Sequence, residues 1–197
     1  IPLGWWVMET ACPHLNNWRK RFKHLSDDFS MSVNIANRQF AHWVLPQRVE
    51  RVLDLTGVAP RNLCLEITET VFMDNPELAA ETIGRLKTIG VNLQMDDFGT
   101  GYSSLSALRT FKLDTLKIDR SFITGIERNR RERAIVRTIT VLAADLGMDV
   151  VAEGIENVRQ LELLRALGCR KGQGYYFSKP LSTNDAERYL MALAPPK

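Results

Sequence analysis

The sequence predicts an α/β protein built from parallel βαβ units. Two observations predict this class: short apolar segments alternate with amphipathic, helix-like segments along the whole chain, and polar side chains recur where the apolar segments end. No low-complexity linker or shift in composition divides the chain. We therefore expect residues 1–197 to form a single domain.

The elements follow in a regular order. A helical pattern covers 4–22, and we expect Pro13 to interrupt it or to begin a turn. Six candidate strands come next, at 29–36, 62–68, 91–96, 115–119, 149–154 and 174–178. Helical patterns lie at 44–56, 76–89, 103–109, 130–147, 157–167 and 183–193, with glycine-containing turns at the joints.

Six strand–helix units suit two architectures. An open, doubly wound sheet of six strands usually has a glycine-rich phosphate turn after its first strand, and "NIANRQF" is no such turn. The alternative is a TIM-like (β/α)8 barrel of which this chain supplies about six units, with the first two strands missing. The positions of the polar residues decide between these architectures.

Polar residues gather at the predicted strand ends. They are Asn34, Glu66, Glu69, Asp96, Asp97, Lys117, Asp119, Glu153, Glu156 and Gln173, the last just before the sixth candidate strand. In a parallel barrel the carboxyl ends of all strands meet on one face, where active sites lie. Each residue alone has an ordinary alternative: Glu66 as a paired core charge, Asp97 as a helix cap, Glu156 as a first-turn residue. The full set favours the barrel and a functional pocket.

Such a carboxylate cluster requires cations, and a single lysine is too few. The oxygen ligands favour Mg²⁺ or Mn²⁺ over zinc, because the three histidines (His14, His24 and His42) all lie early in the chain. Two adjacent aspartates can each bind one metal where a strand gives way to a loop. A pair of metals suits attack of an activated water on a phosphodiester.

Composition limits the possible partners and compartments. The net charge of +3 is too small to indicate binding of a nucleic-acid polymer. No apolar run is long enough for a membrane span, and no signal peptide is visible. Cys12, Cys64 and Cys169 are widely spaced and predict free thiols in a reducing compartment. We expect a cytoplasmic protein, on its own or as the cytoplasmic part of a membrane-anchored one.

The motifs "SVNIANRQF", "LEITET", "DDFGTGYSSL", "LKIDRSF", "VAEGIE" and "GQGYYFSKP" closely resemble those of EAL domains, bacterial phosphodiesterases that hydrolyse cyclic di-GMP. The resemblance covers essentially the whole chain, in the family's order, and implies a modified (β/α)8 barrel. It also implies metal-dependent hydrolysis of cyclic di-GMP to linear pGpG in second-messenger signalling. The alternative is a non-catalytic cyclic di-GMP receptor or protein-interaction module.

The resemblance also implies roles for individual residues. Asn34, Glu66 and Asp96 would bind a first metal, with Asp96 shared, and Asp97 a second. Lys117 would orient the attacking water, Glu153 would be a ligand or general base, and Glu69 and Gln173 would support catalysis. Asp119, Glu156 and Pro180 would lie at the substrate, with Pro180 near a guanine. Glu69 and the loop 98–104 would couple the metals to substrate and to a homodimer contact.

One feature of the family is missing. The Glu-Ala-Leu triplet, whose glutamate is a metal ligand in the family, does not occur in these 197 residues. We expect it to lie before Ile1, together with the two missing strands, so that the chain is an EAL domain incomplete at its N-terminus. Upstream sensory or GGDEF modules are then possible, and this fragment itself could be inactive.

Overall fold

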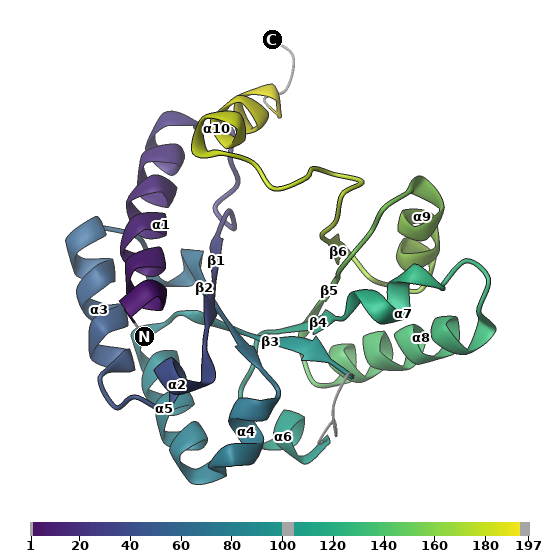
Figure 1. Ribbon diagram of the computed structural model, residues 1–197, viewed down its shortest axis with the longest axis horizontal. Coiled ribbons are helices and arrows are strands. Elements are labelled where there is room, and N and C mark those ends of the chain that lie inside the picture. Colours follow the sequence, from purple (N-terminus) through teal and green to yellow (C-terminus); the bar gives the residue numbers. More distant parts are fainter. Residues whose placement is uncertain (1, 100–104, 194–197) are drawn as a thin grey trace.

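The computed structural model describes residues 2–99 and 105–193. Its strands form one six-stranded parallel sheet in the order β1-β2-β3-β4-β5-β6. Figure 1 shows this sheet curled into part of a barrel, with helices on its outer side. The predicted α/β class and the partial (β/α)8 barrel are confirmed.

The strands are β1 (Met31–Ile35), β2 (Leu63–Thr68), β3 (Asn92–Phe98), β4 (Thr115–Ile118), β5 (Asp149–Ala152) and β6 (Lys171–Gly172). Five positions in β2 and all four in β4 are buried, as expected for strands covered on both faces. Because neighbouring strands run parallel, their carboxyl ends share one edge of the sheet. We call this edge the carboxyl edge and the opposite one the amino edge.

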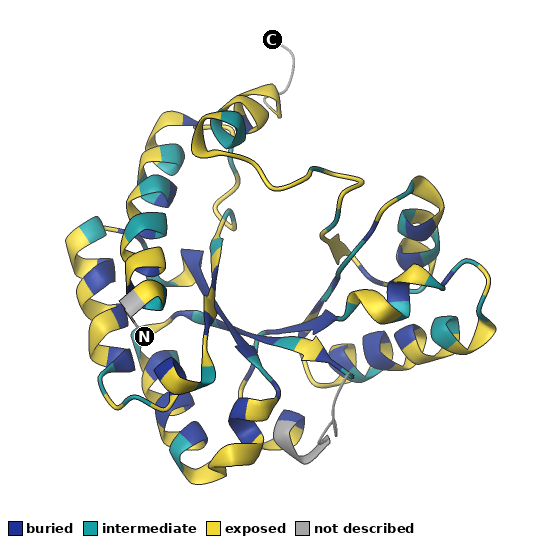
Figure 2. Ribbon diagram, viewed as in Figure 1, coloured by how far each residue is buried: buried dark blue, intermediate teal, exposed yellow. Residues whose placement is uncertain are grey.

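The helices are α1 (Pro2–Arg21), α2 (Asn37–Phe40), α3 (Leu45–Thr56), α4 (Thr70–Asp74), α5 (Pro76–Ile89), α6 (Leu105–Thr110), α7 (Arg120–Thr124), α8 (Arg130–Asp145), α9 (Val158–Ala166) and α10 (Thr183–Ala192), with a 3-10 turn at Pro60–Asn62. Local sequence explains their ends: the Asn75 side chain accepts from the Leu78 amide to begin α5, and Gly90 ends it at a φ of 95°. Buried positions line the sheet and the inner helix faces in Figure 2. No helix in the described residues is long and apolar enough to cross a membrane.

Two predictions about the elements were wrong. Pro13 does not interrupt the first helix, because α1 is continuous from Pro2 to Arg21. A proline inside a helix destabilises it by about 3 kcal/mol. Met8, Cys12 and Leu15 are fully buried on the same helix, and burying such side chains contributes roughly 1.5–3 kcal/mol each. Packing against the core therefore outweighs the lost hydrogen bond.

The second wrong prediction is the strand at 174–178. The sixth strand is Lys171–Gly172, and the aromatic run after it forms a turn. Gly174 approaches Ile155 so closely that a Cβ would lie 2.1 Å from the Ile155 carbonyl oxygen. The Tyr176 amide then donates to that oxygen at 2.9 Å, which turns the chain out of the sheet. Gln173 therefore follows β6 rather than preceding it.

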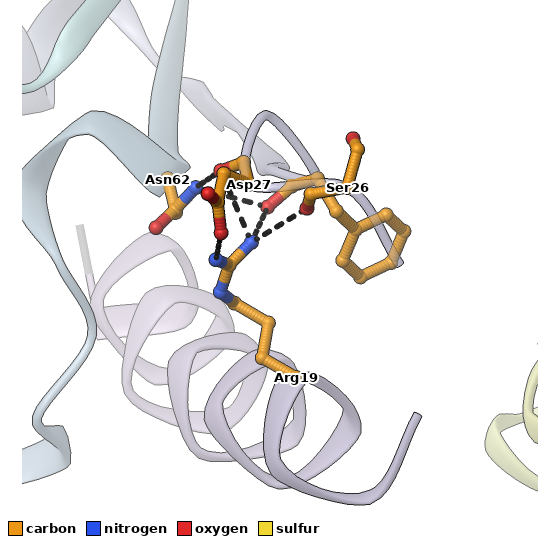
Figure 3. Close-up of polar contacts among 5 residues, drawn as sticks. Arg19, Ser26, Asp27 and Asn62 are labelled. Carbon is orange, nitrogen blue, oxygen red and sulfur yellow. Dashed lines mark hydrogen bonds and ion pairs between the residues drawn. The ribbon is translucent and has the colours of Figure 1, made fainter. Parts of the chain in front are cut away.

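The amino edge is held by hydrogen bonds to backbone carbonyls (Figure 3). Arg19 Nη1 donates to the carbonyl oxygens of Ser26, Asp27 and Phe29 at 3.2, 3.3 and 2.9 Å. From the other side, Asn62 Nδ2 donates to the carbonyls of Asp27 and Phe29 at 2.8 and 3.1 Å. These bonds connect the segment before β1 to α1 and to the residue before β2, all at the amino edge.

Candidate metal centre

A β-bulge brings the side chains of two adjacent aspartates to the same part of the sheet. Successive side chains of a regular strand point to opposite faces of the sheet. Between two paired positions β3 contains one residue more than β4, so Asp96 and Asp97 together lie opposite Lys117. Asp97 adopts a φ of 55°, a left-handed conformation that aspartate tolerates better than most residues. One carboxylate oxygen each from Asp96, Asp97 and Glu153 lie within 4.8 Å of one another.

Lys117 lies at the centre of this cluster. Its side chain is buried, and Nζ lies 2.8 Å from Glu66 Oε2 and 2.9 Å from Asp96 Oδ1, with a third contact to Glu153 Oε1. Burial alone would lower the pKa of Lys117, but the hydrogen bonds to Glu153, Glu66 and Asp96 raise it well above its ordinary value. The lysine is therefore a fixed positive charge at neutral pH.

One ammonium group does not balance the acids around it. Burial, followed by the nearby charges of Asp96 and Asp119, raises the pKa of Asp97. Burial also raises the pKa of Glu153, although its hydrogen bond to Lys117 opposes the shift. Raised carboxyl pKa values show that the site disfavours its own negative charge. Oxygen donors held this close together fit a hard divalent cation.

One further predicted metal ligand, Asn34, lies on β1, and a predicted catalytic residue, Glu69, lies just after β2. Asn34 is exposed on β1 and pairs in register with Glu66 on β2, so both belong to the carboxyl half of the sheet. Glu69 is buried at the start of α4, one residue after β2 ends. The structure thus brings Glu66 and Glu153 into contact with Lys117 and places Asn34 opposite Glu66.

We call the segments that directly follow the strands the rim, and two of the three predicted substrate residues, Asp119 and Glu156, lie on it. Asp119 Oδ1 accepts from the Ser121 amide at 2.9 Å to begin α7. Burial would raise the pKa of Asp119, but the hydrogen bonds from Ser121 and the neighbouring backbone lower it. Gln173 is exposed just after β6, and Pro180 is exposed on the segment between β6 and α10 (Figure 1).

Glu156 has a partner that sequence reasoning missed. Its Oε1 accepts from Arg120 Nη2 at 2.6 Å. The alkyl part of Arg120 lies over Gly154, where a Cβ would come 2.3 Å from Arg120 Cγ, and Gly154 adopts a φ of 72°. The glycine of "VAEGIE" is the sequence feature that could have indicated this close approach. The Glu156 carboxylate is therefore held by the first residue of α7, while its backbone amide donates to Gln160 Oε1 in the first turn of α9 at 2.7 Å.

A polar cavity of about 760 Å³ lies against the inner side of the sheet. Its lining runs from Asn62 and Asp114 at the amino edge to Glu66 and Gln173.

The predicted dimer loop falls largely outside the described residues, which resume at Leu105.

The family model for the EAL domain matches residues 1–180 of this chain. An uncharacterized protein of Synechocystis sp. is 40% identical over 190 residues, covering 96% of this chain and 27% of the relative. The oxygen sensor protein DosP of Escherichia coli is 35% identical over 195 residues, covering 99% of this chain and 24% of the relative. The chain thus spans about a quarter of the length of these curated relatives.

Several solved structures are similar in fold to this chain. The EAL enzyme Bd1971, with cAMP and cyclic di-GMP bound, matches at a TM-score of 0.93 and 34% identity, covering 96% of this chain and 52% of that one. The EAL domain of Mycobacterium smegmatis DcpA matches at 0.90 and 35%, covering 98% and 86%. Klebsiella pneumoniae BlrP1, in a complex with manganese and cyclic di-GMP, matches at 0.83 and 26%, covering 92% and 45%.

Proposed function

The chain belongs to the EAL domain family, and on that premise we propose that its carboxyl edge hydrolyses cyclic di-GMP to linear pGpG. The single observation that carries the proposal is the cluster of Asp96, Asp97 and Glu153 oxygens around Lys117. Structures of relatives with cyclic di-GMP bound, and one with manganese as well, support the choice of substrate and of a divalent metal.

The residues divide the proposed work as follows. Asp96 and Asp97 would hold two divalent cations, Mg²⁺ or Mn²⁺, with Asn34, Glu66 and Glu153 completing the oxygen donor set. When bound, such cations activate water and stabilise charge on a phosphodiester. Lys117 would contribute a positive charge toward the phosphate, and Glu153 would act either as a metal ligand or as the general base. Glu69 and Gln173 would support the site from beside it.

The rim would hold the dinucleotide. Asp119 and Glu156 lie on the rim after β4 and β5, and Pro180 lies further along the chain, between β6 and α10. The Arg120–Glu156 pair keeps one carboxylate in place at that rim.

The experiment is an incubation of the protein with cyclic di-GMP, with and without Mg²⁺ or Mn²⁺, followed by separation of the nucleotides. We expect pGpG in the presence of metal and none after chelation. Cyclic di-GMP that binds without being cleaved under every metal condition would identify a receptor instead. No binding and no cleavage would reject the nucleotide altogether.

We further propose a cytoplasmic protein that forms a homodimer through the loop 98–104 and the helix after it. The free, buried cysteines support a reducing compartment. Sedimentation across micromolar concentrations, with metal and nucleotide present, should show a dimer. A monomer throughout would reject the proposed contact.

A further inference from the structure

A closed ring of side-chain hydrogen bonds joins two strand ends at the carboxyl edge. Thr68 Oγ1 donates to Asn37 Oδ1 at 2.9 Å, and Asn37 Nδ2 donates to Thr70 Oγ1 at 2.6 Å. The two hydroxyl oxygens lie 3.0 Å apart. Because Thr68 already donates to Asn37, Thr70 is the donor in this last contact, so each residue donates once and accepts once. Two of the three contacts are exposed, so the ring fixes the geometry of the two segments more than it stabilises the fold.

Asn37 is the member of the ring that follows β1. The helix that follows, α2, has four residues, and Ala36 at its N-cap gives no side-chain hydrogen bond. The amide of Asn37 therefore supplies the side-chain anchor at this junction, three residues beyond Asn34.

The other two members of the ring flank Glu69. Thr68 is the last residue of β2 and Thr70 the first of α4. Fixing both hydroxyls restricts the backbone on either side of Glu69, whose side chain is buried. In the sheet register Thr68 also lies opposite Asp96. The ring therefore fastens the ends of the strands that carry the proposed ligands.

We propose that Asn37 is a positioning residue of the metal centre. It holds the end of β1 against the β2–α4 turn, so that Asn34 and Glu66, which pair in register, are presented together. This inference rests on the proposed function and adds to it a residue that positions the proposed metal ligands. Groups hydrogen-bonded directly to metal ligands change metal affinity or activity by roughly 10–100-fold when removed, and Asn37, which acts through the backbone of β1, should fall at the low end of this range.

The test is a calorimetric titration of the metal-free protein with Mn²⁺. Asn37→Ala should raise the Kd for Mn²⁺ by roughly tenfold. The matched control is Asn16→Ala, because Asn16 Nδ2 also makes one 2.6 Å bond across the chain, to the Thr56 carbonyl at the end of α3. The control should lower the melting temperature without changing the Kd by more than about twofold.

A second pair of variants keeps the proposal testable if Asn37→Ala folds poorly. Thr70→Val removes the hydroxyl but keeps the shape and should weaken Mn²⁺ as Asn37→Ala does. Thr70→Ser keeps the hydroxyl and should bind like the wild type. The proposal is overturned if Thr70→Val and every folded Asn37 variant bind Mn²⁺ within twofold of the wild type.

The Mn²⁺ titration and the hydrolysis assay together show which of the two proposals fails. A wild type that binds Mn²⁺ but leaves cyclic di-GMP intact rejects the phosphodiesterase, while the variants still decide the role of Asn37. Hydrolysis with unchanged Mn²⁺ affinities rejects Asn37 alone. A wild type that binds no Mn²⁺ rejects both.

Discussion

The balance of charged side chains differs between the two edges of the sheet. At the amino edge charged groups meet matched partners: Lys87 Nζ lies 2.7 and 2.8 Å from the two Asp114 oxygens, and Asp114 Oδ2 also accepts from the Leu93 amide at 2.7 Å. At the carboxyl edge one ammonium, Lys117, faces three carboxylates with Asp97 beside them. The difference indicates that the amino edge stabilises the fold, while the carboxyl edge is arranged for a cation.

The largest effect should come from removing the lysine. Lys117→Met leaves Glu66, Asp96 and Glu153 without their shared positive charge. Breaking a buried ion pair from one side destabilises by about 3–5 kcal/mol. Chemical unfolding of the metal-free protein should show a loss of this size, partly recovered by Mn²⁺. A variant as stable as the wild type would mean that the acids are already protonated.

Asp97→Asn should separate chemistry from stability. The amide keeps the shape of the side chain but removes a charge that the site disfavours. Losing about 3 kcal/mol of electrostatic stabilisation lowers turnover by more than a hundredfold. The melting temperature without metal should hold or rise, whereas loss of a simple helix cap would lower stability by about 1 kcal/mol and keep activity. A fully active Asp97→Asn would refute the assignment.

The opposite behaviour is expected at the amino edge. Arg19→Met removes the hydrogen bonds to the carbonyls before β1 and should lower the free energy of unfolding by about 1–2 kcal/mol. Turnover should stay within about twofold of the wild type, because Arg19 lies at the far edge from Asp97. Loss of activity in a well-folded Arg19→Met would remove the contrast between the two edges.

The smallest effect is a pH dependence. The native pKa of Asp97 is raised above its ordinary value of 3.8. Without metal the charged side chain therefore destabilises the fold above the raised native pKa, and this effect fades as the pH falls from there to 3.8. The difference in unfolding free energy between the wild type and Asp97→Asn should thus be largest at neutral pH and shrink on acidification. A difference that grows on acidification would contradict the raised pKa.

Sequence periodicity could predict the parallel units and the shared carboxyl edge, because a helix between successive strands returns the chain to the same end of the sheet each time. It could not predict the turn at Gly174, which depends on the approach of Ile155 from another segment. Nor could it predict that Pro13 lies inside α1, where buried neighbours compensate.

The candidate site also has features that the sequence predicts and features that depend on the fold. The pair Asp96–Asp97 is visible as sequence, but the bulge that brings both carboxylates together depends on the pairing of β3 with β4. The contacts of Arg120 with Glu156 and of Asn37 with Thr70 join residues 36 and 33 positions apart. Such contacts follow from the pairing of β1 with β2 and of β4 with β5 rather than from any local pattern.

The central claim is that the carboxyl edge binds a divalent cation through Asp96 and Asp97. The most direct measurement is the melting temperature of the wild type, of Asp97→Asn and of Arg19→Met during a titration with Mn²⁺. A cation that binds the native state raises the melting temperature with its concentration. We predict a clear rise for the wild type and for Arg19→Met, and a much smaller one for Asp97→Asn. Equal rises in all three proteins would contradict the account.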